Sequence, residues 1–152
     1  GDRTEHVLWR LENGNIDGIS PKLAVLMIGT NNHMSSPPKV TARDIRLIVK
    51  QLRTKLPKTK VLVLAVFPRG GGDDDGARRI NMTVNELIAD LGDGKMVYHL
   101  NINEAFLDGR RLRHNLIPDG THPNEKGYAA WAEAMEPTLA KLLGEEPIIP
   151  GD

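Results

Sequence analysis

The sequence contains no cysteine, which excludes disulfide bonds, thiolate metal sites and cysteine nucleophiles. Neither charge is in excess, because 20 basic residues stand against 20 acidic ones, and there is no long basic tract. Nucleic acid is therefore not expected as a partner. No apolar run approaches the length of a membrane span, so a span is not expected either. The first residue is glycine rather than methionine, which leaves the localisation open.

The length of 152 residues and the hydrophobic content of 39% predict a single domain with an ordinary core. We expect this domain to comprise residues 1–143, followed by a flexible proline-rich tail at 144–152. Short apolar runs at residues 22–28, 60–67 and 96–100 predict strands. The first two are continuous rather than alternating, which is typical of a parallel sheet covered on both faces.

Helical patterns alternate with these runs. Apolar residues recur at helical spacing from Val7, from Ile45, from Ile80 and from Tyr128. The last pattern contains Pro137, which predicts a kink or a break in that helix. The alternation of helices with strands predicts a three-layer α/β domain with right-handed crossovers.

A glycine-rich, acidic segment at residues 68–76 follows the second apolar run. It lacks the Gly-x4-Gly-Lys-Ser/Thr spacing of a phosphate loop, and its three adjacent aspartates would repel phosphate. It also lacks the alternating ligand positions of a calcium loop. The segment is therefore predicted to be a solvated, flexible loop on the rim of the site, without a metal.

A carboxylate precedes an imidazole by three residues in the segment Asp119-Gly-Thr-His122-Pro. Asp119 can accept a hydrogen bond from one ring nitrogen and fix the tautomer of His122. The other nitrogen is then able to take a proton from a hydroxyl nucleophile, as in serine hydrolases. Taken alone, the pattern fits equally well a turn that Asp119 initiates and a helix that His122 caps.

Polar side chains follow the first apolar run, at Gly29-Thr-Asn-Asn32. Open α/β sheets place their sites at the carboxyl ends of the strands. Asn31 is suited to an oxyanion hole, because a neutral amide can donate to developing negative charge without forming a permanent ion pair. Asn32 is expected instead to satisfy backbone groups of the loop.

Four segments, at residues 1–14, 29–32, 63–70 and 119–124, together resemble the SGNH, or GDSL, hydrolases, and above all the platelet-activating-factor acetylhydrolase-like esterases. The resemblance implies a flavodoxin-like SGNH hydrolase fold and a serine esterase that acts on small acyl esters of a lipid or a sugar. It implies that the Gly1 backbone and Asn31 donate to the oxyanion, and that Asp119 and His122 complete the triad. No cofactor and no metal is implied.

The sequence departs from this family pattern in its nucleophile. The family's Gly-Asp-Ser block would precede Gly1, so we expect the chain to lack its nucleophilic serine and the first two strands of the fold, and to be inactive alone. Ser20 precedes a predicted strand, and Ser35 and Ser36 lie in a loop, so none occupies a strand-to-helix turn.

Two consequences follow from this expected truncation. In a sheet of order 2-1-3-4-5, loss of the first two strands would leave the run 22–28 at an edge, which predicts self-association or a homo-oligomer. The second consequence concerns function. A non-catalytic ligand-binding or interaction domain with an SGNH-like fold is the alternative to the esterase.

Overall fold

The computed structural model describes residues 1–72 and 75–148. In chain order, its elements are α1 (Thr4–Glu12), β1 (Leu23–Leu26), the 3-10 helix η1 (Thr30–Met34), α2 (Pro38–Lys55), β2 (Lys60–Leu64), α3 (Gly76–Ile88), β3 (Val97–Leu100), η2 (Asn103–Phe106), β4 (Leu107–Asp108), β5 (Arg111–Leu112) and α4 (Glu125–Leu143). The predicted strands and helices are thus present.

The main sheet has three parallel strands in the order β1-β2-β3, with Leu23 opposite Lys60 and Val61 opposite Val97. The strand β2 ends at Leu64, earlier than the apolar run predicts. The reason lies in Val66, whose backbone N–H and C=O are hydrogen bonded at 2.7 and 2.8 Å to the side-chain amide of Asn85 in α3. The Asn85 side chain therefore takes the place of a neighbouring strand as the hydrogen-bond partner of the Val66 backbone.

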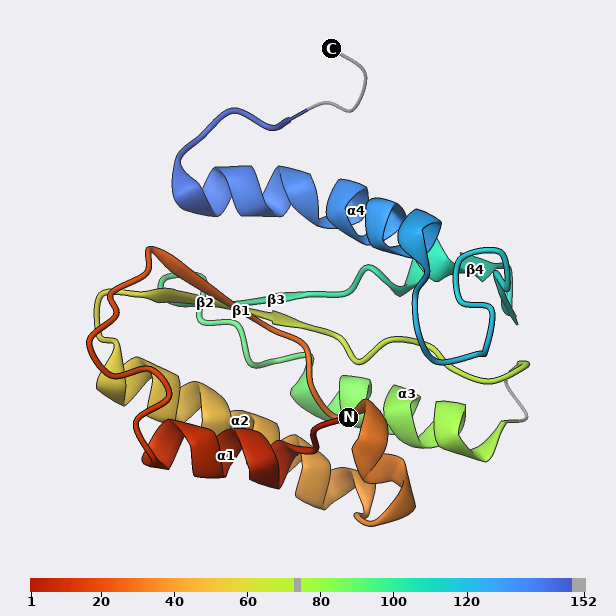
Figure 1. Cartoon of the computed structure of the whole chain (residues 1–152), viewed down its shortest axis with the longest axis horizontal. Helices are drawn as coiled ribbons and strands as arrows, with labels where there is room; N and C mark the ends of the chain where they lie inside the picture. The colour runs from red at the N-terminus through yellow and green to blue at the C-terminus, as the bar shows by residue number, and fades with distance from the viewer. Residues whose placement is uncertain (73–74, 149–152) are drawn as a thin grey trace.

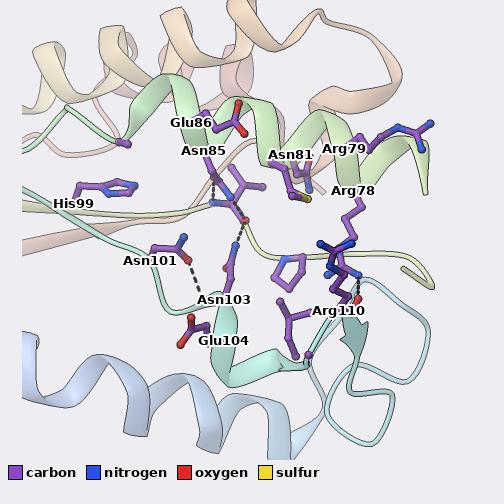
Figure 2. A pocket seen from close by; sticks show the side chains of 16 residues that line it. Arg78, Arg79, Asn81, Asn85, Glu86, His99, Asn101, Asn103, Glu104 and Arg110 are labelled. Carbon is purple, nitrogen blue, oxygen red and sulfur yellow. Dashed lines mark hydrogen bonds between the residues drawn. The ribbon is translucent and has the colours of Figure 1, made fainter. Parts of the chain in front are cut away.

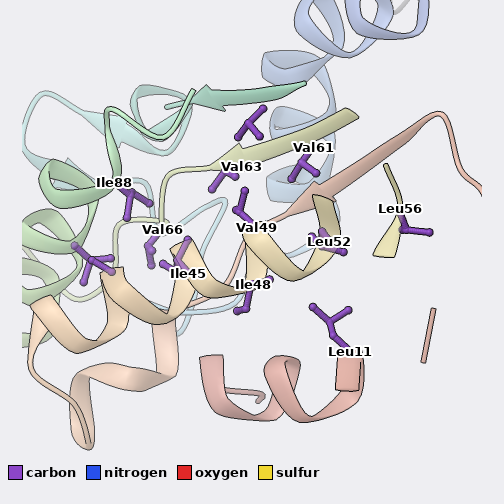
Figure 3. Close-up of a cluster of buried hydrophobic side chains, with 13 residues drawn as sticks. Leu11, Ile45, Ile48, Val49, Leu52, Leu56, Val61, Val63, Val66 and Ile88 are labelled. Carbon is purple, nitrogen blue, oxygen red and sulfur yellow. The ribbon is translucent and has the colours of Figure 1, made fainter. Parts of the chain in front are cut away.

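The sheet lies between two helical layers, with α1, α2 and α3 on one face and α4 on the other (Figure 1). Alternate residues of β2 point into the two cores. Val61 and Val63 pack among Ile45, Ile48 and other apolar residues of the three-helix side (Figure 3). Leu62 and Leu64 belong to the second core on the α4 side, and these four apolar residues of β2 are fully buried. The three-layer α/β architecture is confirmed.

The last helix runs without interruption from Glu125 to Leu143, through Pro137, so the alternative of a break is wrong. A proline removes one backbone donor, and the turns on either side retain theirs. The side chain of Asn124 caps the start of this helix by accepting from Gly127 N–H at 3.0 Å.

Among the described residues, none of the helices combines the length and the apolar character that a membrane span requires.

Several short features were not predicted, namely the two-residue antiparallel strands β4 and β5 and the two 3-10 helices. Segments this short are too brief to show a periodic pattern of apolar residues.

Of the expected tail, residues 145–148 form neither helix nor strand, and residues 149–152 lie outside the described residues. Residues 73–74 of the glycine-rich loop also lie outside them.

The strand β1 pairs with β2 along one side, and along its other side no described strand pairs with it. Its Val25 side chain is 42% exposed. We expect this edge to support self-association, which Val25→Lys should weaken, because edge charges oppose strand pairing. Sedimentation velocity of the two proteins checks the expectation. Strong hydrogen-exchange protection of every amide in residues 23–28 of a dilute monomer would contradict it.

Candidate active site

The loop at residues 119–122 holds the carboxylate and the imidazole together. His122 Nδ1 lies 2.6 Å from Asp119 Oδ2. The other carboxylate oxygen accepts the backbone N–H groups of Thr121 and His122 at 2.9 and 2.7 Å. Gly120 allows this tight turn with a φ of +76°. Asp119 therefore both initiates a turn and contacts the imidazole, whereas α4 is capped by Asn124 and not by His122.

The imidazole is open to solvent on the side away from Asp119, since the His122 side chain is 80% exposed. Its Nδ1 is engaged with the carboxylate, so Nε2 is the nitrogen that can exchange a proton with an incoming hydroxyl. A general base and the acid that orients it would require this geometry.

The hydrogen bond from His122, followed by the two backbone N–H bonds, holds the pKa of Asp119 well below its usual range. We expect the carboxyl resonance of Asp119 to titrate at a pH clearly below the ordinary value for aspartate. His122→Ala should raise this pKa, because it removes the largest cause and leaves the two backbone bonds. A ¹³C NMR titration of both proteins checks this, and an Asp119 pKa that His122→Ala leaves unchanged would contradict it.

Asn31 lies in η1, directly beyond the carboxyl end of β1. Its Nδ2 donates to the Asp2 carbonyl at 3.1 Å, and a primary amide has a second N–H available. The Gly1 backbone packs so closely on the Asn31 amide that a Cβ at position 1 would overlap its nitrogen. Two residues predicted as oxyanion donors are thus neighbours.

Asn32 has a structural role, but its hydrogen-bond partners lie at the start of α1 and not in its own loop as expected. Its buried side chain accepts from Thr4 N–H at 3.1 Å and donates to Thr4 Oγ1 at 2.9 Å. It therefore fixes the start of α1 against η1, which in turn keeps the adjacent Asn31 beside the first residues of the chain.

Arg69 connects the loop of Asn31 with the loop of His122, and sequence analysis missed it. The guanidinium donates to the Thr30 carbonyl at 3.2 Å and to Thr121 Oγ1 at 3.1 Å. The next residue, Gly70, donates its backbone N–H to the Gly120 carbonyl at 2.9 Å. The available signal was the position of Arg69 just after the buried run of β2, at the edge where α/β sheets place their sites.

The three serines of the chain have no hydrogen bond to His122 within the described part of the protein. Ser20 stands before the amino end of β1, and the backbone N–H groups of Ser35 and Ser36 are bonded to the Asn32 carbonyl at 2.9 and 2.8 Å. None of the three lies on a turn from a strand into a helix.

Among the described residues, no cluster of three or more His, Cys, Asp or Glu could hold a metal ion.

A cavity of about 1090 Å³ lies elsewhere, between α3 and the η2–β4 segment (Figure 2). Asn81 and Asn85 line it from α3, His99 from β3 and Asn103 from η2. Burial lowers the pKa of His99, which favours its neutral form. None of the four predicted site residues lines this cavity.

Residues 1–130 match the GDSL-like Lipase/Acylhydrolase family. Platelet-activating factor acetylhydrolase IB subunit alpha1 of Pongo abelii is 37% identical over 149 residues, and subunit alpha2 of Rattus norvegicus is 37% identical over 150 residues. The alignments cover 96% and 97% of this chain, and 63% and 64% of those relatives. The chain thus spans less than two thirds of their length.

Solved structures share the fold. A GDSL-like lipase from Bacteroides thetaiotaomicron aligns with a TM-score of 0.75 and 20% identity, over 92% of this chain and 72% of that chain. A catalytic mutant of an acetylxylan esterase from Geobacillus stearothermophilus, with alanine in place of a serine, aligns with a TM-score of 0.72 and 17% identity, over 95% and 69%. A carbohydrate acetylesterase from Sinorhizobium meliloti aligns with a TM-score of 0.68 and 20% identity, over 88% and 67%.

Proposed function

Because this chain belongs to the GDSL-like lipase/acylhydrolase family, we propose that it supplies the base, the orienting acid and two oxyanion donors of a serine ester hydrolase. His122 is the base, Asp119 orients it, and Asn31 and the Gly1 backbone bind the oxyanion. The observation that carries the proposal is the 2.6 Å contact between Asp119 and His122, in a loop that Arg69 ties to the loop of Asn31.

The nucleophile in this proposal is a serine of a Gly-Asp-Ser segment outside residues 1–152. Two observations support it. The three serines of this chain stand away from any strand-to-helix turn, and the chain spans only 63% of the length of the relative from Pongo abelii. The acetylxylan esterase with a similar fold was crystallised as a catalytic mutant that lacks a serine, which agrees with a serine mechanism.

The reaction follows from these roles. The serine hydroxyl attacks the ester carbonyl while His122 Nε2 takes its proton, and the carbonyl oxygen becomes an oxyanion bound by Asn31 and Gly1. The intermediate then releases the alcohol, which receives the proton from His122. Water, deprotonated by His122, attacks the acyl-serine in the same way. The second intermediate releases the carboxylic acid, and His122 returns its proton to the departing serine oxygen, which restores the serine.

We propose acetyl esters as the substrates. Three of the names specify removal of an acetyl group: platelet-activating factor acetylhydrolase, carbohydrate acetylesterase and acetylxylan esterase. The acetylated molecule is platelet-activating factor in the first name and a carbohydrate in the other two. Rates with p-nitrophenyl acetate, butyrate and octanoate test the acyl preference once the chain is joined to a segment that carries the Gly-Asp-Ser turn, and the rate should fall as the acyl chain lengthens. Acetylated xylo-oligosaccharides and an acetylated ether lipid then distinguish the two alcohol classes.

The test of the proposed function compares the chain alone with the chain joined to an upstream segment that carries two strands and the Gly-Asp-Ser turn; we call this second protein the complemented enzyme. The chain alone should be nearly inactive, and the complemented enzyme should hydrolyse p-nitrophenyl acetate faster by orders of magnitude. Strong esterase activity of the chain alone that survives His122→Ala would refute the proposal. Absence of activity in a folded complemented enzyme would favour the non-catalytic binding domain.

Removal of the Asn31 amide should lower kcat of the complemented enzyme. Loss of one oxyanion donor costs about 10² to 10³-fold, because the donor acts mainly in the transition state. Asn31→Asp is the matched variant of equal size, and its negative charge should lower kcat at least as much as Asn31→Ala. Steady-state kinetics check this, and a change confined to KM would contradict the assignment.

A further inference from the structure

We propose that Arg69 is a positioning residue, which sets the distance between the loop at residues 119–122, with His122, and the η1 segment at residues 29–34, with Asn31. The inference rests on the proposed function, because it assigns Arg69 a role in that reaction. Arg69 follows β2, the central strand of the sheet, and its side chain is half-buried. Among the residues that the structure describes, no hydrogen bond joins residues 29–34 directly to residues 119–122, whereas the guanidinium contacts both segments.

The two bonds of the guanidinium are directed to groups beside the reacting residues. On one side Arg69 Nη1 donates to the carbonyl of Thr30, which precedes Asn31. On the other side Nη2 donates to the hydroxyl of Thr121, which precedes His122. Since the two donors belong to one planar group, the separation of the two acceptors is fixed by its geometry.

The neighbouring His33 strengthens the oxyanion side of this bridge. His33 Nδ1 lies 2.8 Å from the Thr30 carbonyl and 3.3 Å from Arg69 Nη1. Arginine can only donate and a carbonyl oxygen can only accept, so His33 Nδ1 cannot form hydrogen bonds with both partners at once. The shorter distance assigns the proton to His33 Nδ1, and the Thr30 carbonyl then accepts from both side chains. This carbonyl is held from two directions.

The Asp119–His122 pair does not depend on Arg69. Its three hydrogen bonds lie within residues 119–122. Removal of Arg69 should therefore leave the pair intact and change its position relative to Asn31. A displacement of about 1 Å in a catalytic group can cost about 10²-fold in rate. The expected signature is a fall in kcat with an unchanged acid–base pair.

The experiment measures Arg69→Ala, Arg69→Lys and Arg111→Ala in the complemented enzyme. Arg69→Ala should lower kcat about 10²-fold with KM within a few-fold, and added guanidinium ion should restore part of the rate. Arg69→Lys should resemble Arg69→Ala, since a single ammonium cannot reproduce the planar fork. Arg111, exposed in β5, is the matched control and should retain the rate.

Thr121 provides a second test of the same bridge. Thr121→Val removes the acceptor of Arg69 and should lower kcat, whereas Thr121→Ser keeps the hydroxyl and should lose far less. If the two residues act together, the double variant Arg69→Ala with Thr121→Val should be no slower than the worse single variant. Independent, additive losses would overturn the bridge.

A readout on the 152-residue chain separates this inference from the proposed function. Arg69→Ala should speed hydrogen exchange of the Gly70 amide, which donates to Gly120, while the pKa of Asp119 stays depressed. The inference is overturned if kcat is unaffected, or if Asp119 regains an ordinary pKa together with a lower urea midpoint, which would show a general loss of structure. An inactive complemented enzyme would contradict the proposed function, and Gly70 exchange would still test the bridge.

Discussion

Replacement of His122 by alanine should lower kcat of the complemented enzyme by about 10⁵ to 10⁶-fold, because the serine then has no base and the leaving alcohol has no acid. The fold should not change, since the His122 side chain is 80% exposed and belongs to neither hydrophobic core. Steady-state hydrolysis of p-nitrophenyl acetate and a urea titration measure the two effects separately.

The matched control for this variant is His114→Ala, at another exposed histidine of the preceding loop. It should leave kcat and the urea midpoint unchanged. Equal losses in the two variants, or a His122→Ala protein with most of its activity, would show that the imidazole of His122 is not the base.

The second large effect is expected from Asp119→Asn, which should lower kcat by about 10⁴-fold. The asparagine can still accept the backbone N–H groups through its oxygen, so the turn should persist. Its NH₂ group, however, would face His122 Nδ1 and would favour the tautomer with the proton on Nε2. That nitrogen could then no longer accept the proton of the serine.

Asp108→Asn makes the same chemical change at an exposed carboxylate of β4, and it should leave kcat unchanged. Nitrogen-15 NMR of the histidine rings reports the tautomer directly. An Asp119→Asn enzyme in which His122 keeps its proton on Nδ1 would contradict the explanation even if the rate falls.

Whether a feature could be predicted from the sequence depends on how far apart its residues lie in the chain. The contact between Asp119 and His122 spans three residues, and a short segment was enough to predict it. The contacts of Arg69 span 39 residues to Thr30 and 52 residues to Thr121. No short segment contains them, and the glycines and aspartates around Arg69 indicated only a solvated loop.

The same distinction applies to the fold. The apolar runs predicted the three parallel strands and the two helical layers. Consecutive residues of β2 are apolar, so both faces of this strand must be covered. The end of β2 was predicted too late, because the Val66 backbone bonds to the Asn85 side chain, 19 residues away. An apolar run does not show whether its backbone partner is a strand or a side chain.

Covalent labelling of the complemented enzyme with a fluorophosphonate, followed by peptide mass spectrometry, shows which serine His122 activates. Such a reagent forms a stable adduct with a serine that a neighbouring base activates. We predict one adduct, on the serine of the Gly-Asp-Ser segment, that disappears in His122→Ala. An adduct on Ser20, Ser35 or Ser36, or labelling that persists without His122, would contradict it.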